Sequence, residues 1–455
     1  MLVIFPRNAA DVCLGAAAAL GLGFSCSALS QPVASEPDVL PIDLPTALRL
    51  ADERNRDVAI YIERIAEASA RVTQARTLAV PTLRAGATYD RHTGNIQETG
   101  GQVLDVDRAS RFTAMRAVLD IDVADAVFAP LVARQNRAAV TAASTANRHL
   151  VLLDVASAYL RLLQSREETS IAQGSLERAL NLAMLTADYA EAGEGLLADA
   201  EMAAVQPLVW EQRRLIAVER TEIAAAELAR LLHLGSGIEL EPLESEVPSL
   251  EIFAGDEDVE QLVSRALLDR PESEQYDALV AAAEDDLKAQ RYGLFIPSVL
   301  LGYNIGEFGG APGSSIRNTD DRDDLTLSLY WQFGNLGFGH RARTNEKRAQ
   351  LRQVSLERDK LRDSIIAEVR KTHARIRSLG QQLEFSRSAI ARAEEAYRLN
   401  RDRIFDQQGL PLEALQAMQM LAQAELADLD ARAEHGLAQV RLHTLLGNPL
   451  DSEIQ

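Results

Sequence analysis

The sequence predicts a mainly α-helical chain with a membrane β-barrel portion, in which long coiled helices and four β-strands are arranged as two structural repeats. Three observations lead to this prediction: an internal repeat, helical stretches too long for a compact domain, and paired runs of alternating apolar and polar residues. The chain has 455 residues, more than one ordinary core contains, and only 5% are aromatic. Long exposed helices are therefore favoured over a thick globular core.

The first residues have the features of an export signal, which we assign to residues 1–30. Arg7 gives a weakly positive start, Leu14 to Phe24 form an apolar stretch, and Ala28 to Ser30 offer small residues at the cleavage spacing. The apolar stretch is shorter than the ~20 residues that a membrane-spanning helix needs. We therefore expect the segment to direct export rather than to span a membrane.

Both cysteines of the chain, Cys13 and Cys26, lie in this predicted signal. The region after the signal therefore has no disulfide and no thiol nucleophile. Cys26 is either an ordinary cysteine of the signal or, as in many exported bacterial lipoproteins, a lipidated N-terminus. The triplet before it begins with Gly23, whereas lipoprotein signals usually have leucine there, and this favours the ordinary cysteine.

An internal repeat divides the remaining chain into two copies of one unit, residues 31–250 and 251–455. Pro81 corresponds to Pro297 and Gly86 to Gly302, each pair 216 positions apart. The segments AEAGEGLLADAE and FDQQGLPLEALQ align at an offset of 214, as do the helix ends LARLLHL and LHTLLGN. An offset that changes so little along the whole unit indicates a true repeat.

Each unit is predicted to contain an entry helix, two strands, a very long helix and a shorter return helix. A proline ends each entry helix because it cannot continue the helical hydrogen bonds. At 1.5 Å per residue the long helices measure roughly 90–100 Å, so they must form an extended coiled layer. We expect entry helices at 45–80 and 259–296, long helices at 132–192 and 341–406, and return helices at 196–233 and 412–446.

The strand-like runs after each entry helix lead to the membrane prediction. In the second unit, apolar and polar residues alternate from Leu325 to Phe333, and a similar run spans Val299 to Ile305. The runs of the first unit, Leu83 to Tyr89 and Phe112 to Val123, alternate less regularly. Each run has about 10 residues, the length that a tilted strand needs to cross the hydrocarbon layer.

Four strands cannot close a membrane barrel, which needs at least about eight. We therefore expect several copies to share one barrel, and three copies would supply twelve strands. Trp331 and Phe333 end the last strand, where membrane barrels carry aromatic girdles.

The acidic run from Asn318 to Asp324 lacks the EF-hand spacing, so we expect an exposed, solvated loop rather than a calcium site.

The negative net charge and the absence of catalytic motifs from the sequence argue against several classes of function. A formal net charge of −20 argues against nucleic acid as a partner and fits an acidic surface or an aqueous lumen that favours cations. The sequence has no HExxH, no P-loop and no nucleophile set, and no pattern groups His373, His435 and His443 as metal ligands. We therefore predict no catalytic residue, no metal site and no cofactor.

Taken together, the repeat, Pro81 and Pro297 before the strands, the segment WQFGNLGFGHRA and the Gly-Leu turns resemble the TolC family of outer-membrane efflux channels. The resemblance covers nearly the whole mature chain. It implies a homotrimer, with a twelve-stranded barrel in the lipid of the bacterial outer membrane and a long periplasmic α-barrel. It also implies a passive exit duct of a tripartite efflux or secretion system, bound to a periplasmic adaptor and an inner-membrane pump.

The resemblance assigns the two Gly-Leu turns to the periplasmic tip that contacts the adaptor. These turns are Gly195-Leu196 and Gly409-Leu410, and they also fit helix C-caps followed by a hydrophobic residue. Both descriptions can hold at once, because a capped turn at the tip can also be a docking surface.

Family members often narrow the periplasmic mouth with carboxylates shortly after the turn glycine. Glu201 has that place in the first unit, whereas Leu415 occupies it in the second. Asp406 and Glu413 are the alternative carboxylates there.

A soluble periplasmic coiled-coil scaffold is the alternative function. The sequence does not identify the transported substrate, which could be a drug, a metal ion or a polypeptide.

Overall fold

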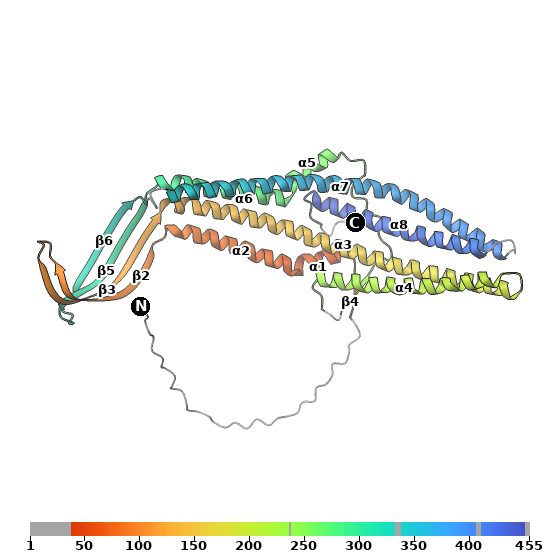
Figure 1. Cartoon of the computed structure of the whole chain (residues 1–455), viewed down its shortest axis with the longest axis horizontal. Coiled ribbons are helices and arrows are strands. Elements are labelled where there is room, and N and C mark those ends of the chain that lie inside the picture. Colours follow the sequence, from red (N-terminus) through yellow and green to blue (C-terminus); the bar gives the residue numbers. More distant parts are fainter. Residues whose placement is uncertain (1–37, 236–237, 333–337, 406–410, 451–455) are drawn as a thin grey trace, which may run out of the picture. The chain divides into compact units, whose positions relative to one another are not determined.

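The computed structural model describes residues 38–235, 238–332, 338–405 and 411–450 (Figure 1). The described residues from Val39 onward, which include both repeats, belong to a single body. Several predictions concern residues outside this set. They are the export signal at 1–30 and the residues Cys26, Phe333, Asp406, Gly409 and Leu410.

A four-stranded antiparallel sheet contains the predicted strands. The strand order is β2-β3-β5-β6, so β2 and β6 form the two edges. The strands have 16, 20, 15 and 11 residues, more than the predicted ten, because each extends beyond its alternating run at one end or at both. Their bounds are β2 (Thr82–Gln97), β3 (Val103–Asp122), β5 (Ser298–Pro312) and β6 (Asp320–Tyr330).

The prediction that the acidic run forms a loop was wrong for Asp320 to Asp324. These residues form the first part of β6 and pair with β5, with Asp320 opposite Phe308 and Asp324 opposite Asn304. The hydrogen-bond register with β5 holds this segment extended although it is charged. The strand also ends earlier than predicted, at Tyr330, so that Trp331 lies just outside it.

Each entry helix is two helices rather than the single helix predicted. In the first unit, the side-chain oxygen of Asn55 accepts from the Asp57 N–H at 2.8 Å, and its Nδ2 donates to the Leu231 carbonyl at 3.0 Å. In the second unit, Pro271 disfavours the helical conformation of Arg270, which is extended at ψ 130°. The bounds are α1 (Leu44–Arg54), α2 (Arg56–Arg76), α5 (Val259–Asp269) and α6 (Pro271–Tyr292).

The long helices and the return helices recur in both units. The long helices contain 69 and 68 residues, and each return helix contains 35. Within the described residues no helix is both long and apolar enough to cross a membrane. The long helices are α3 (Val123–Glu191) and α7 (Phe338–Phe405), and the return helices are α4 (Leu197–Leu231) and α8 (Pro411–Leu445).

The helices form a layer in which the entry helices and the return helix of each repeat follow one another along its long helix (Figure 1). The helices α6 and α8 contact both α3 and α7, whereas α2 and α4 pack along α3. The sheet continues directly from this layer, because β3 runs into α3. A short 3₁₀ turn at Thr77–Ala79 follows α2, and two residues separate this turn from β2. The mainly helical architecture with four longer strands is therefore confirmed.

A small sheet was not predicted. Strands β1 (Asp38–Ile42) and β4 (Ile238–Pro242) pair beside the middle of α3. The largest apolar cluster lies there and includes Ile42, Tyr159 and Leu228, all with no more than 1% of their surface exposed. The Tyr159 hydroxyl donates to the Glu244 carboxylate, and the Ile42 carbonyl lies 3.3 Å from the same oxygen, so its polar end is satisfied in this core.

Candidate functional site

One face of the four-stranded sheet is apolar and exposed. Successive side chains of a strand point to opposite faces, so the alternating residues of all four strands share this face. Leu325, Leu327 and Leu329 of β6 are 72%, 69% and 60% exposed, and Leu83 of β2 is 71% exposed. A contiguous apolar surface of this kind marks contact with a partner or with lipid. Its other large members are Tyr89, Met115, Leu301, Tyr303 and Ile305.

The opposite face of the sheet carries charged and small residues, together with the neighbouring rings of Phe112 and Phe308. Two hydrogen bonds between strands show which side chains share this face. The Tyr330 hydroxyl donates to Asp120 at 3.0 Å, and Nε of Arg116 donates to Oδ1 of Asn304 at 2.5 Å. The sheet therefore separates an apolar surface from a polar one, as the alternation predicted.

Both edges of this sheet lack a neighbouring strand among the described residues. The strand β2 pairs only with β3, and β6 pairs only with β5. Each edge thus presents unpaired backbone N–H and C=O groups along its length. In a hydrocarbon environment such groups are tolerated only when another strand pairs with them.

The first Gly-Leu turn lies at the far end of the helices from the sheet, between α3 and α4 (Figure 1). Gly193 adopts φ +79°, and the backbone N–H of Gly195 donates to the Tyr189 carbonyl at 3.0 Å, which caps α3. A Cβ on Gly195 would lie 3.2 Å from the Ala190 nitrogen, so the turn favours glycine there. Leu196 follows it and is 68% exposed.

The predicted aperture carboxylates have different surroundings. Glu201 is exposed near the start of α4, and no ion pair holds it within the described part of the chain. Glu413, near the start of α8, pairs with Arg403 at 3.0 Å, so its charge is largely compensated. Leu415, which departs from the carboxylate pattern, is 5% exposed and belongs to an apolar cluster with Tyr397 and Met418.

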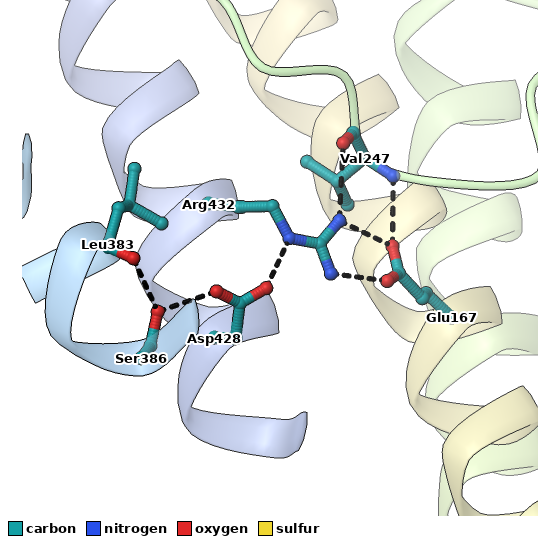
Figure 2. A network of polar contacts seen from close by, with 6 residues as sticks. All are labelled: Glu167, Val247, Leu383, Ser386, Asp428 and Arg432. Atoms are coloured by element: carbon teal, nitrogen blue, oxygen red, sulfur yellow. Dashed lines mark hydrogen bonds and ion pairs between the residues drawn. The ribbon is translucent and has the colours of Figure 1, made fainter. Parts of the chain in front are cut away.

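A buried ionic network joins helices of both repeats, and sequence reasoning missed it (Figure 2). Arg432 of α8 contacts Glu167 of α3 at 2.5 Å and Asp428 of its own helix at 2.7 Å. Ser386 of α7 donates to Asp428 at 2.5 Å, and the Val247 N–H donates to Glu167 at 2.9 Å. No local motif could reveal this network, because its members lie on three different helices and one connecting segment.

The electrostatics of this network favour the charged form of Arg432. Burial lowers the pKa of the guanidinium, but the hydrogen bonds to Glu167 and Asp428 outweigh burial and raise the pKa. Each carboxylate therefore has a cationic partner in a site where only 9–17% of the three side chains is exposed. The network is a fixed structural contact, and within the described residues no group of acidic, histidine or cysteine side chains could hold a metal ion.

Comparisons with known proteins agree with this architecture. The family of outer membrane efflux proteins matches residues 262–448. The pyoverdine export outer membrane protein OpmQ of Pseudomonas aeruginosa is 26% identical over 312 residues, a match that spans 67% of this chain and 63% of that protein's length.

Solved channels share the fold. The outer membrane protein VceC of Vibrio cholerae superposes with a TM-score of 0.75 at 17% identity, covering 90% of this chain and 97% of that one. The open state of the MtrE outer membrane channel of Neisseria gonorrhoeae gives 0.72 at 21% identity, with 90% of each chain covered. The predicted TolC-like fold is therefore confirmed.

Proposed function

Because the outer membrane efflux protein family matches residues 262–448, we propose that this chain is the outer-membrane exit duct of a tripartite efflux or secretion system. One observation carries the proposal: a sheet with an exposed apolar face and two unpaired edges runs directly into helices of 69 and 68 residues. In a soluble scaffold the apolar face and the two unpaired edges of this sheet would be left in water, so the scaffold alternative is not favoured.

In the proposed assembly, three copies contribute their sheets to one twelve-stranded barrel in the outer membrane. The β6 edge of one copy pairs with the β2 edge of the next, which satisfies the backbone groups that each sheet leaves unpaired. The apolar face, with Leu325 and Leu327, meets lipid, and the polar face lines the lumen. The helices continue the tube into the periplasm.

The duct conducts passively, without catalysis, a metal or a cofactor of its own. Energy comes from an inner-membrane pump, reached through a periplasmic adaptor that contacts the tip turn at Gly195 and Leu196 and, in the second repeat, the residues Gly409 and Leu410. Glu201, which has no ion pair among the described residues, supplies negative charge at the periplasmic mouth, and Asp406 and the ion-paired Glu413 are the further candidates there. The relative OpmQ is a pyoverdine export outer membrane protein, which favours an exported solute of that class as the cargo.

Conduction is tested with the purified protein in planar lipid bilayers. We expect detergent-dependent solubility and discrete, long-lived conductance steps. A water-soluble monomer that produces no conductance would contradict the exit-duct proposal and favour the scaffold.

Adaptor contact is tested by export from cells that depend on this chain. Leu196→Ser with Leu197→Ser removes two apolar side chains, 68% and 72% exposed, from the tip. The matched control is Leu268→Ser, because Leu268 is 83% exposed on α5, away from the tip. We expect export to fall strongly in the tip variant only, with bilayer conductance unchanged in both. Equal export in the two variants would contradict the tip assignment.

A further inference from the structure

We propose that Arg84 and Arg116 form a cationic belt on the inner wall of the β-barrel, which binds anionic solutes, bearing carboxylate or phosphate groups, as they leave through the duct. This inference rests on the proposed function, because the polar face of the sheet becomes an inner wall only when the barrel closes. It concerns the charge of the cargo, about which the family assignment says nothing.

The two arginines are direct neighbours across the β2–β3 strand pair. Arg84 of β2 is the register partner of Arg116 of β3, so both side chains lie on the same face of the sheet. That face is the polar one, because Arg116 donates to Asn304 and the apolar residues Leu83 and Met115 lie at the adjacent, opposite-facing positions. Both arginine side chains are exposed there.

Such a pair costs stability in an isolated sheet. Like charges directly opposite each other on neighbouring strands repel, whereas opposite charges or apolar pairs stabilise by about 0.2–1 kcal/mol. The next register partner in the row is Asn304, which accepts a hydrogen bond from Arg116 without neutralising it. Within the described residues, neither Arg84 nor Arg116 has a carboxylate partner.

The carboxylate that completes this row is already engaged. Asp324 lies opposite Asn304, and its Oδ2 is 3.1 Å from Nε of Arg322. The Arg322 guanidinium in turn lies over the rings of Phe112 and Phe308, at 5.5 and 5.3 Å from their centroids. Arg322 is thus held against the wall with its own counter-ion, and the charge on Arg84 and Arg116 is left uncompensated.

This positive level contrasts with the rest of the chain. The net charge of −20 fits either an acidic surface or a lumen that favours cations, and the polar face of the sheet does carry acidic residues on either side of the belt. Asp120 lies toward the helices, and Asp90 and Asp320 lie toward the opposite end. Along this face a solute therefore passes from acidic side chains to basic ones. There the planar guanidinium groups can each bind a carboxylate or phosphate by two hydrogen bonds.

Closure of the barrel repeats the pair around the wall. Each copy adds Arg84 and Arg116 at the same height, so the belt surrounds a solute instead of contacting one side. Several guanidinium groups around a confined lumen attract multivalent anions most strongly, and salt weakens that attraction. Multivalent anions are therefore the probes with which to test the belt.

The test uses inositol hexakisphosphate as a blocker of single-channel current in planar bilayers. The variant Arg84→Gln with Arg116→Gln removes the belt, and Arg111→Gln removes an arginine from the opposite face of the same strand as the matched control. We expect the wild-type channel and the control to be blocked at similar concentrations, and the belt variant to need at least about tenfold more blocker. Unitary conductance in the absence of blocker should persist in all three.

A second measurement separates this inference from the exit-duct proposal. Calorimetric titration of the same probe into the detergent-solubilised full chain reports binding without requiring conduction, with the elution volume as the check on assembly. Binding that is lost in the belt variant and kept in the control supports the belt. Equal block or equal binding in the belt variant and the wild type would overturn it, even for a channel that conducts.

Discussion

The helices α3 and α7 have equivalent places in the two repeats and nearly equal lengths, yet they are buried in different ways. Around its middle, α3 is buried on several faces, with Val151, Leu152, Val155, Leu160 and Leu163 all at most 8% exposed. The buried residues of the middle of α7 instead follow one line with alternating spacings of four and three. They are Ile365, Val369, Thr372, Ile376, Leu379 and Leu383.

The difference follows from the neighbours that each helix has in its own copy. The helices α2, α4, α6 and α8 all pack against α3, whereas α7 contacts mainly α5, α6 and α8. On α7, Leu356 and Phe385 are 68% and 75% exposed. One copy therefore encloses α3 but leaves a flank of α7 open, and we expect an adjacent copy to cover that flank.

The largest effect on the free energy of unfolding is expected at the buried ion pair that joins α8 to α3. Arg432→Ala leaves Glu167 and Asp428 without their cation, although only 12% and 9% of these side chains is exposed. Breaking a buried pair in this way costs about 3–5 kcal/mol of the free energy of unfolding. Thermal and urea unfolding in detergent measure the loss.

An ion pair on α7 provides the control for Arg432. Arg375 contacts Glu434 at 2.6 Å, but the two side chains are 59% and 44% exposed. Arg375→Ala should therefore change the unfolding free energy by no more than about 1 kcal/mol. If the two variants unfold alike, the enclosed and open sides of the layer do not differ as we describe.

A somewhat smaller effect is expected from an apolar truncation in α3. Leu163 is 1% exposed, so Leu163→Ala removes a packed side chain and should cost about 2–5 kcal/mol. Leu356→Ala on α7 should change the unfolding of a single copy by less than about 0.5 kcal/mol. Similar urea midpoints for these two leucine variants would contradict the proposed asymmetry.

The open flank of α7 is probed by assembly instead of folding. Phe385→Ser removes an exposed ring that we expect the adjacent copy to bury, a contact that contributes about 1.5–3 kcal/mol at each interface. The variant should dissociate at a lower detergent concentration or temperature, while its helical circular dichroism stays unchanged. Wild-type resistance to dissociation would show that no copy covers this flank.

The smallest effect is a pH dependence at the contact between α8 and the connecting segment. Oε1 of Gln439 accepts from the Ile252 and Phe253 N–H groups, which directs its Nε2 toward Nε2 of His435. The imidazole must therefore accept at that nitrogen and is neutral. Burial lowers the pKa of His435, and the Glu251 charge opposes this only in part.

The sign of this dependence follows from the lowered pKa. The ordinary pKa of histidine is 6.5. As the pH falls below this value, the unfolded chain takes up a proton at His435 that the folded chain resists, so the free energy of unfolding decreases as the pH decreases. His435→Gln should flatten the stability profile between about pH 7 and 5. The test compares melting temperatures of the two proteins across that range, and parallel profiles would contradict the neutral assignment of His435.

The sequence predicted well those elements whose signal is local. Alternation located all four strands of the larger sheet, and glycine with a following leucine located the turn at Gly195 and Leu196. The charged part of β6 was missed because Asp320 to Asp324 are extended through pairing with β5, which lies earlier in the chain. Periodicity alone carries no information about such pairing.

The features that sequence reasoning missed depend on partners far along the chain. Asn55 interrupts the first entry helix and is bonded to Leu231, 176 residues away. The contact between Glu167 and Arg432 spans 265 residues. Only the break at Arg270 had a local signal, since Pro271 follows it.

The number of copies in one particle is the most direct test of the shared barrel, because we expect neighbouring copies to cover the open flank of α7 and to pair with the edges of β2 and β6. Native mass spectrometry of the detergent-solubilised protein measures this number. We predict particles of three copies, which dissociate more readily when Phe385 is replaced by serine. A stable particle containing a single copy would contradict the shared barrel and, with it, the proposed duct.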